Sequence, residues 1–197
     1  MVKRLFDIAC SSVGLILLAP FFAVVAILIK RDSSGPVFFR QTRMGQFGKP
    51  FGIYKFRTMC MDAEKKGAQV STGDDPRITE IGRFLRTYKI DELPQLFNVV
   101  FGEMSLVGPR PEVARYVDAF KEDYEEILTA KPGITDYASL EFKDENELLK
   151  AAENPEKKYI DEILPLKIEY YKKYLREQSL STDIKLIFLT LAGIIRR

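Results

Sequence analysis

The sequence predicts an α+β fold that is mainly helical, with a membrane segment ahead of a single larger domain. Three observations support this class: an apolar stretch over residues 5–29, two short segments rich in β-branched and aromatic residues, and helical periodicity through much of the remainder. A chain of 197 residues can bury one ordinary core. The expected organisation is therefore a membrane segment over residues 1–31 and one domain over residues 32–197.

The N-terminal segment has the length and composition of a membrane helix. Asp7 is the one charge within residues 5–29, and about 25 residues at about 1.5 Å each reach roughly 37 Å, enough to cross a bilayer. Pro20 falls near the middle, where it removes a backbone hydrogen bond. Basic pairs flank both ends, Lys3 with Arg4 and Lys30 with Arg31. Both pairs satisfy the positive-inside rule if both ends stay on the cytoplasmic face, which favours a re-entrant helix-break-helix over an ordinary single span.

A small β-hairpin is predicted after this segment. Residues 37–43 and 51–59 favour strands, and the loop between them contains Gly45, Gly48 and Pro50. Residues 62–76 are polar and contain Gly67, Gly73 and Pro76, which indicates a short helix followed by an exposed loop.

The rest of the chain shows mostly helical periodicity. Gly102 ends one of the predicted helices, Pro132-Gly133 ends another, and Pro165 is expected to bend or split a third. The predicted elements are a helix over 78–89, a helix over 93–101, a short buried strand or extended piece at 105–107, a long amphipathic helix over 113–128 and a helix over 155–178. The C-terminal segment 182–197 fits either an interfacial helix lying on a bilayer or a helix docked into the core.

Composition restricts the chemistry that this chain can perform. The net charge is +2, and there is no basic run with interleaved aromatic residues, so nucleic acid is not an expected partner. The chain has no histidine, so an acid, base or nucleophile must come from another residue type. Cys10 and Cys60 lie in dissimilar settings without ligand-like neighbours, which indicates reduced thiols rather than a disulfide or a zinc site.

Adjacent carboxylates, Asp91 and Glu92, stand before a predicted helix. Proline is tolerated in the first turn of a helix, so Pro94 places Asp91 at or near the N-cap, where the ionised form is favoured. An ionised, shielded carboxylate can attack phosphorus, and the neighbouring carboxylate can hold Mg²⁺. The simpler interpretation is a capping Asp91 with an exposed Glu92.

Several basic residues are candidates for binding an anionic substrate. Pro109 and Pro111 fix the backbone on both sides of Arg110, so this guanidinium is presented rigidly before a helix expected to begin at Glu112. Lys55 and Arg57 alternate along the second strand and should share a face. Arg83 and Arg86 lie three residues apart on a helix. A rigid turn and solvated faces are the structural alternatives.

Taken together, these segments resemble the bacterial sugar transferases called monotopic phosphoglycosyl transferases. The resemblance covers nearly the whole chain up to about Gly133, and so many long matches in the right order are highly specific. The matching runs are Lys3-Arg4-Leu5-Phe6-Asp7, Gly35-Pro36-Val37-Phe38-Phe39-Arg40-Gln41, Tyr54-Lys55-Phe56-Arg57-Thr58-Met59, Asp75-Pro76-Arg77-Ile78-Thr79, Asp91-Glu92-Leu93-Pro94-Gln95-Leu96-Phe97-Asn98-Val99 and Met104-Ser105-Leu106-Val107-Gly108-Pro109-Arg110-Pro111-Glu112.

The resemblance implies a Mg²⁺-dependent enzyme of the bacterial inner membrane, with its catalytic domain on the cytoplasmic face. It would transfer a sugar-1-phosphate from a UDP-sugar to a polyprenol phosphate and so start a glycan such as O-antigen, capsule or exopolysaccharide. Asp91 would be the nucleophile that carries the phosphosugar, and Glu92 would bind the metal, with Asp91 beside it. The residues implied for substrate binding are Lys55, Arg57, Arg86, Gln95, Pro109, Arg110 and Pro111.

One departure and two alternatives accompany the resemblance. After Thr135 many members continue with a Gly-Arg-Asn-type element, whereas this chain has residues 136–145 of different sequence, which leaves the identity of the sugar open. An inactive membrane-anchored scaffold of the same fold is one alternative, although it would need neither carboxylate. Direct one-step transfer without a covalent intermediate is the other. Membrane phospholipids are expected partners, and the oligomeric state is open, with a homodimer as one option.

Overall fold

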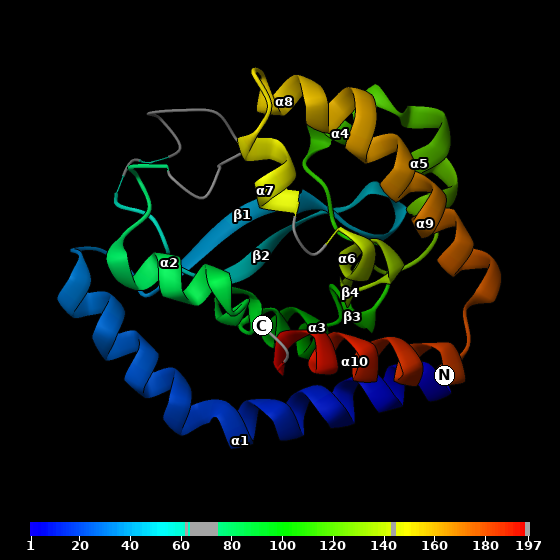
Figure 1. Cartoon of the computed structure of the whole chain (residues 1–197). Coiled ribbons are helices and arrows are strands. Elements are labelled where there is room, and N and C mark those ends of the chain that lie inside the picture. Colours follow the sequence, from blue (N-terminus) through cyan, green and yellow to red (C-terminus); the bar gives the residue numbers. More distant parts are fainter. Residues whose placement is uncertain (62, 64–74, 143–144, 196–197) are drawn as a thin grey trace.

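The structure is a computed structural model that describes residues 1–61, 63, 75–142 and 145–195. Helices surround two small sheets, which confirms the mainly helical α+β class (Figure 1). The strands are β1 (Phe38–Met44), β2 (Pro50–Phe56), β3 (Ser105–Val107) and β4 (Gly133–Thr135). The helices are α1 (Val2–Asp32), α2 (Glu80–Thr87), α3 (Gln95–Phe101), α4 (Ala114–Ala119), α5 (Lys121–Ile127), α6 (Tyr137–Glu141), α7 (Glu145–Lys150), α8 (Pro155–Lys158), α9 (Leu164–Glu177) and α10 (Leu180–Ile195).

The predicted hairpin is confirmed. Strands β1 and β2 pair antiparallel, from Phe38 opposite Phe56 to Met44 opposite Pro50. The ring of Phe38 stacks on that of Phe56, with 5.4 Å between centroids, and this cross-strand pair fixes the register at the membrane-helix end of the hairpin. The helix and loop predicted for residues 62–76 fall almost entirely outside the described residues.

The N-terminal segment forms one uninterrupted helix, so the prediction of two helices separated by a break is wrong. Helix α1 continues through Pro20, and Figure 1 shows that it changes direction along its length. Proline removes a single backbone hydrogen bond, and the turns on either side sustain the helix at the cost of a bend. By length and composition, α1 is the one helix among the described residues that could cross a membrane, and most of its apolar window is exposed.

The basic pair at the start of α1 docks onto the domain. Arg4 donates to the carbonyl oxygens of Val99 at 2.6 Å and Val100 at 3.1 Å, which lie at the C-terminal end of α3. Lys3 pairs with the buried Asp183 of α10 and donates to a carbonyl oxygen of β3. Both side chains therefore hold α1 to the protein, where the sequence indicated only which side of the membrane this end would lie on.

Asp7 has a structural reason for lying within an apolar helix. Its carboxylate is buried and accepts hydrogen bonds from the Ser105 hydroxyl at 2.8 Å and the Leu106 backbone N–H at 3.2 Å. A buried carboxylate is tolerated when such donors satisfy it. Asp7 thereby fastens α1 to the exposed edge of β3.

Between residues 105 and 135 one prediction is confirmed and another needs correction. The short buried strand expected as one option for residues 105–107 is confirmed as β3, although its parallel partner β4 was not predicted. The long helix expected over 113–128 is divided into α4 and α5, because Phe120 leaves helical geometry with φ −129° and ψ 46°. Both halves still bury their apolar residues, including Val117 and Ile127, against α9, so the core survives the break.

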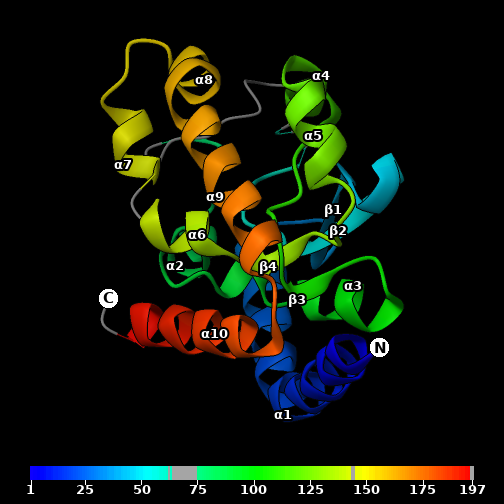
Figure 2. The ribbon, with the colours of Figure 1, turned by 90° about the vertical axis from the view of Figure 1, so that its right-hand side faces the viewer.

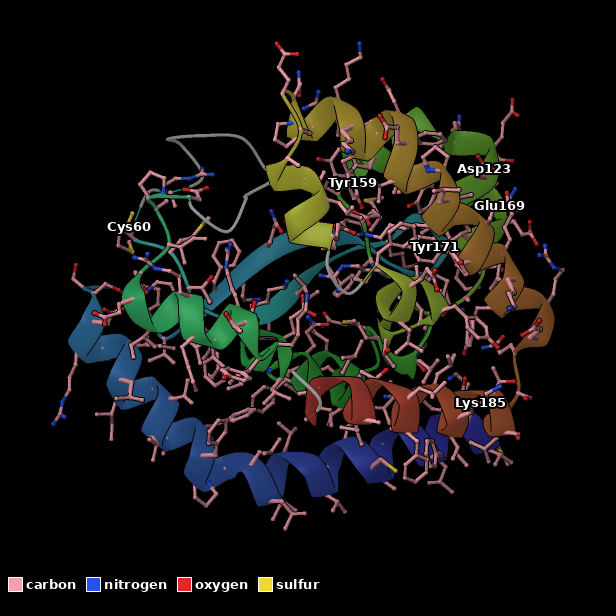
Figure 3. All side chains as sticks on the ribbon, in the orientation of Figure 1. Cys60, Asp123, Tyr159, Glu169, Tyr171 and Lys185 are labelled. Carbon is pink, nitrogen blue, oxygen red and sulfur yellow. The ribbon has the colours of Figure 1, made fainter. Side chains whose placement is uncertain are left out.

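The helix predicted from Pro155 is confirmed as a continuous helical path with an irregular middle. A π-helical turn over Tyr159–Ile163 joins α8 to α9, and Pro165 falls in the first turn of α9, where its missing N–H costs little. Figure 3 shows Tyr159 and Tyr171 on the inner side of these helices, and both side chains are buried.

Helix α10 combines the two alternatives left open by the sequence. Leu186 is fully buried against β3 and its neighbours, so one face is docked. Phe188, Leu189 and Leu191 remain exposed on the other side. Figures 1 and 2 place α10 and α1 on the same side of the molecule, so this side carries most of the exposed apolar surface.

Candidate active site

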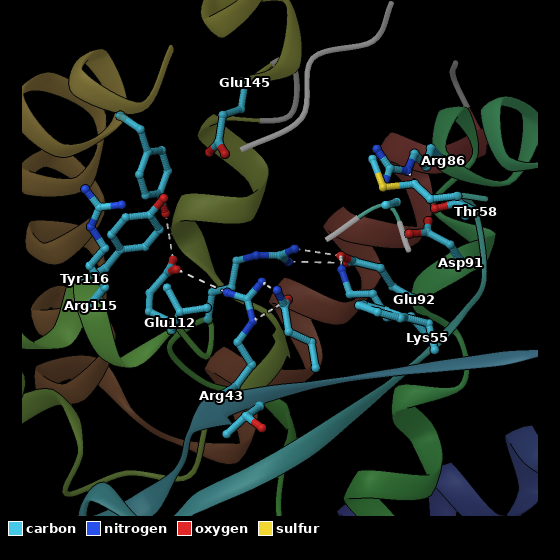
Figure 4. A pocket seen from close by; sticks show the side chains of 18 of the residues that line it. Arg43, Lys55, Thr58, Arg86, Asp91, Glu92, Glu112, Arg115, Tyr116 and Glu145 are labelled. Carbon is cyan, nitrogen blue, oxygen red and sulfur yellow. Dashed lines mark hydrogen bonds and ion pairs between the residues drawn. The ribbon is translucent and has the colours of Figure 1, made fainter. Parts of the chain in front are cut away.

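A pocket of about 690 Å³ opens between the hairpin, the turn from α2 to α3, and the helices α4, α7 and α9. Asp91 and Glu92 line it, and so do Lys55, Arg86 and Arg110 (Figure 4). The five charged residues singled out from four separate motifs therefore meet in one place. A polar cavity of this size can hold a nucleotide-sugar-sized ligand.

The two carboxylates lie on a short 3₁₀ turn over Ile90–Glu92. Lys89 adopts a left-handed conformation with φ 56°, which ends the path of α2 and turns the chain toward the pocket. Helix α3 begins only at Gln95 with Pro94 at its cap position, so the prediction that Asp91 caps this helix is wrong. The extra 3₁₀ turn displaces Asp91 from the helix N-terminus.

Glu92 is clamped by two cations. Arg110 donates from Nη2 to Oε1 at 2.6 Å and from Nη1 to Oε2 at 3.3 Å, and Lys55 donates from Nζ to Oε1 at 2.7 Å. Burial favours the protonated acid, but Arg110 and Lys55 outweigh it and hold the pKa of Glu92 well below its ordinary value. Glu92 in turn raises the pKa of Arg110 well above its ordinary value, against the effect of burial.

Asp91 has a different environment from its neighbour. It is buried, and no hydrogen bond to its carboxylate is found within the described part of the chain. Burial raises the pKa of Asp91, while Lys55 opposes that rise. The sequence suggested that a helix N-terminus would favour the ionised form of Asp91. In the structure desolvation is the dominant effect, and it favours the protonated form. Arg86 lies on the same side of the pocket and donates to the Thr58 hydroxyl at 2.8 Å (Figure 4).

The turn that presents Arg110 is held by strand β4. The Arg110 backbone N–H donates to Asp136 at 3.0 Å, and Gly133 donates to the Pro109 carbonyl at 2.9 Å. Gly108 and Gly133 approach so closely that a Cβ on Gly133 would lie 2.0 Å from the Gly108 nitrogen. These contacts confirm that the turn is rigid. The two backbones approach so closely that only glycine fits at positions 108 and 133.

Four predicted substrate-binding residues do not line this pocket. Arg57 is buried and donates to the carbonyl oxygens of Ser33 at 2.7 Å and Ser34 at 2.8 Å, so it caps the C-terminal end of α1. Arg57 lies past the end of β2, so its side chain does not have to share a strand face with Lys55, as the sequence had suggested. The other three are Gln95, which is buried in α3, and Pro109 and Pro111, which shape the turn around Arg110.

Sequence reasoning missed the side of the pocket that lies away from Asp91. Helix α4 begins at Ala114, later than predicted, and this leaves Glu112 beside the pocket. The other missed residues there are Arg43, Tyr116, Glu145, Tyr159 and Lys167. Lys167 carried a usable signal, because it is a charged residue between Leu164 and Tyr171 on the apolar face of a helix.

Comparisons with known proteins show the family of this chain. The family model described as bacterial sugar transferase matches residues 1–197. A Klebsiella pneumoniae protein named UDP-glucose:undecaprenyl-phosphate glucose-1-phosphate transferase is 42% identical over 193 residues, covering 95% of this chain and 39% of that protein. An Aeromonas hydrophila protein named UDP-N-acetylgalactosamine-undecaprenyl-phosphate N-acetylgalactosaminephosphotransferase is 37% identical over 199 residues, covering 98% of this chain and 44% of that protein.

A shorter relative is matched over more of its own length. A Bacillus subtilis protein named putative undecaprenyl-phosphate N-acetylgalactosaminyl 1-phosphate transferase is 48% identical over 122 residues, covering 62% of this chain and 68% of that protein. The chain spans only about two fifths of the length of the Klebsiella and Aeromonas relatives. The match to the family covers the carboxylate pair, the hairpin cations and the arginine turn. This chain belongs to the bacterial sugar transferase family.

Proposed function

We propose that this chain transfers a sugar-1-phosphate from a UDP-sugar to a polyprenol phosphate such as undecaprenyl phosphate, releasing UMP. This would be the first membrane step in assembling a glycoconjugate. The observation that carries the proposal is the Asp91 carboxylate, which accepts no hydrogen bond from the described residues and faces a pocket rich in cations. The names of the Klebsiella and Aeromonas relatives support the donor and acceptor classes.

The proposed reaction proceeds through a covalent intermediate on Asp91. An oxygen of Asp91 attacks the phosphorus that carries the sugar, and the bond from that phosphorus to the bridging oxygen breaks. UMP leaves with the bridging oxygen, and the phosphosugar stays on Asp91. An oxygen of the polyprenol phosphate then attacks the same phosphorus, which frees Asp91 and yields a polyprenyl diphosphate sugar.

The surrounding charges support this chemistry. Two anionic substrates must approach two carboxylates, so cations are needed to offset repulsion. Glu92, the chain neighbour of Asp91, holds both Arg110 and Lys55 in the pocket. Arg86 adds a further cation on the Asp91 side, where it favours the ionised carboxylate.

Mg²⁺ fits the donor set of this site. Asp91 offers carboxylate oxygens that accept no hydrogen bond from the described residues, and Glu92 is its chain neighbour. Mg²⁺ commonly takes one or two carboxylates together with substrate phosphate oxygens. We therefore propose that Asp91 and Glu92 hold the ion, with Asp91 as the ligand whose oxygens are not already engaged, since both Glu92 oxygens accept from cations. When bound, the ion would neutralise charge on the diphosphate.

We also propose that α1 is re-entrant, with both ends on the cytoplasmic face and the catalytic domain of residues 32–197 lying on the membrane. Both ends of α1 are fastened to the same folded unit, through Arg4 at the start and Arg57 at the end. A helix crossing the bilayer away from the domain could not make both contacts. The exposed apolar side chains of α1 and α10, on one side of the molecule, support this placement at the interface.

A trapping experiment tests the covalent step. The full chain in lipid nanodiscs is incubated with Mg²⁺ and a UDP-sugar labelled in the sugar, without acceptor. We expect label on the protein, stoichiometric UMP release, and transfer of the label when polyprenol phosphate is added. Label that persists in Asp91→Asn would exclude Asp91 as the nucleophile. UMP release that requires the acceptor, without protein label, would indicate direct one-step transfer, and an inactive scaffold would release no UMP under any condition.

A further inference from the structure

The end of the pocket away from Asp91 is lined by polar side chains that the proposed reaction does not use. We call this group the distal wall. Figure 4 shows Glu112, Tyr116 and Glu145 on one side of the pocket and Asp91 with Arg86 on the other. The distal wall consists of Arg43, Glu112, Tyr116, Glu145, Tyr159 and Lys167.

An ion pair between the buried Lys167 and the partly exposed Glu145 forms the centre of the distal wall. Lys167 is only 3% exposed, and its Nζ pairs with Glu145 and lies 3.4 Å from the Tyr159 hydroxyl. Removing the Lys167 ammonium from water is costly, which offsets much of the attraction to Glu145, and an apolar residue of similar volume would serve packing as well. Stability alone therefore does not account for a Lys–Glu pair at this position.

The distal wall has unused hydrogen-bonding capacity that faces a ligand-sized space. An ammonium group carries three donors, and Glu145 and the Tyr159 hydroxyl account for two of those on Lys167. Glu145 pairs through Oε2, and its Oε1 accepts no hydrogen bond within the described residues. A donor beside an acceptor is the complement of a hydroxyl group, which both donates and accepts.

Charge distinguishes the two ends of the pocket. Lys55, Arg86, Lys89 and Arg110 surround Asp91 and Glu92, giving four cations against two carboxylates. In the distal wall Arg43 and Lys167 are balanced by Glu112 and Glu145, and Arg115, which also lines this end of the pocket, is paired with Glu156. The diphosphate of a donor suits the first end, and an uncharged, hydroxyl-rich group suits the second. Arg110 lines the same pocket and pairs with Glu92.

We propose that the distal wall binds the sugar of the donor, with Glu145 and Lys167 contacting its hydroxyl groups and selecting among sugars. The rings of Tyr116 and Tyr159, 5.1 Å apart, provide apolar surface beside these polar groups, as the two faces of a sugar ring require. This inference rests on the proposed function, because it takes the donor to be a nucleotide sugar. It assigns the specificity of the enzyme to α7 and α9.

Equilibrium binding can test the inference without turnover. Binding of UMP and of a panel including the epimers UDP-glucose and UDP-galactose is measured on full-length Asp91→Asn protein in nanodiscs. The same measurements follow on that protein carrying Glu145→Gln, Lys167→Met or the control Lys172→Met. Lys172 also lies on α9 and forms an ion pair, with Asp123 at 2.6 Å, but it does not line the pocket.

We expect Glu145→Gln to weaken binding of the preferred UDP-sugar by roughly 10- to 100-fold, as for the loss of a charged hydrogen-bond partner. The preference between the epimers should shrink, while UMP binding and the Lys172→Met control remain unchanged. Glu145 is partly exposed, so Glu145→Gln should still fold. Its binding measurements therefore test the inference even if Lys167→Met does not fold. An equal loss of UMP binding would place the nucleoside at the distal wall and overturn the inference, as would unchanged binding of every ligand.

The failure of the proposed function would look different. In that case the unmodified chain would bind the panel but release no UMP from any donor, with or without polyprenol phosphate. The binding measurements on the distal-wall variants would still decide which part of the nucleotide sugar this wall contacts.

Discussion

Arg110 and Glu92, which are 18 residues apart in the sequence, form a two-pronged ion pair in which both carboxylate oxygens accept from the guanidinium, at 2.6 and 3.3 Å. This pair links the turn after β3 to the turn before α3. Lys55 joins it from the hairpin, so three separate segments converge on one carboxylate. Glu92 is therefore an organising residue of the site as well as a candidate metal ligand.

Arg110→Lys should lower kcat/KM for UMP release by roughly 10- to 100-fold, because a lysine cannot reproduce two parallel hydrogen bonds. The loss should be measured against Arg83→Lys, an exposed residue of α2 that does not line the pocket. Activity of Arg110→Lys within threefold of the unmodified chain would show that the two-pronged geometry is not needed.

Asp91→Asn should abolish activity and at the same time stabilise the protein by on the order of 1 kcal/mol, because it removes a buried carboxylate whose charge is desolvated. For a protein of this size that corresponds to a rise in Tm of roughly 2–4 °C. The measurement is thermal unfolding with EDTA and without donor. An unchanged or lower Tm in Asp91→Asn would contradict the buried, unsatisfied state of this carboxylate.

The stabilisation by Asp91→Asn should depend on pH. Burial raises the pKa of Asp91 in the folded protein above its unfolded value, so the folded state binds this proton more tightly. The unmodified chain therefore gains stability as pH falls through the raised pKa toward the unfolded value. The difference in Tm should be largest above the folded pKa and shrink below it, and Glu103→Gln, which changes a carboxylate outside the pocket, should not show this trend.

Arg57→Met should destabilise the fold without weakening substrate binding. Its guanidinium donates to carbonyl oxygens at the end of α1, and their loss should cost about 2–3 kcal/mol. KM for the UDP-sugar should stay within twofold at a temperature where both proteins are folded. Arg40→Met, an exposed arginine of β1, is the matched control. A large rise in KM with unchanged Tm would restore Arg57 as a substrate-binding residue.

Single cysteines at the two ends of α1 should have the same sidedness. A cysteine placed after Ser33 and another placed before Lys3, each in a Cys10→Ser and Cys60→Ser background, should react alike with an impermeant thiol reagent in oriented vesicles. Both ends are held by the same domain, so we expect them on the same face. Opposite labelling would establish an ordinary single span.

The sequence determined the parts of this protein that depend on local pattern. The hairpin followed from β-branched and aromatic residues around a glycine-rich loop, and α3 followed from its apolar spacing and from Gly102 in a left-handed conformation. The sequence also revealed the main charged residues of the site, because two adjacent carboxylates and an arginine between two prolines are unusual local patterns. The match to the family came from those same short runs.

Only the tertiary structure decided how distant segments meet. Arg57 and Lys55 are two residues apart, yet one caps α1 and the other holds Glu92, because the strand ends between them. The distal wall joins residues from β1, α4, α7 and α9, which no local pattern connects. Asp91 became a buried acid with a raised pKa because desolvation depends on the whole fold, whereas the sequence could indicate only the nearest helix.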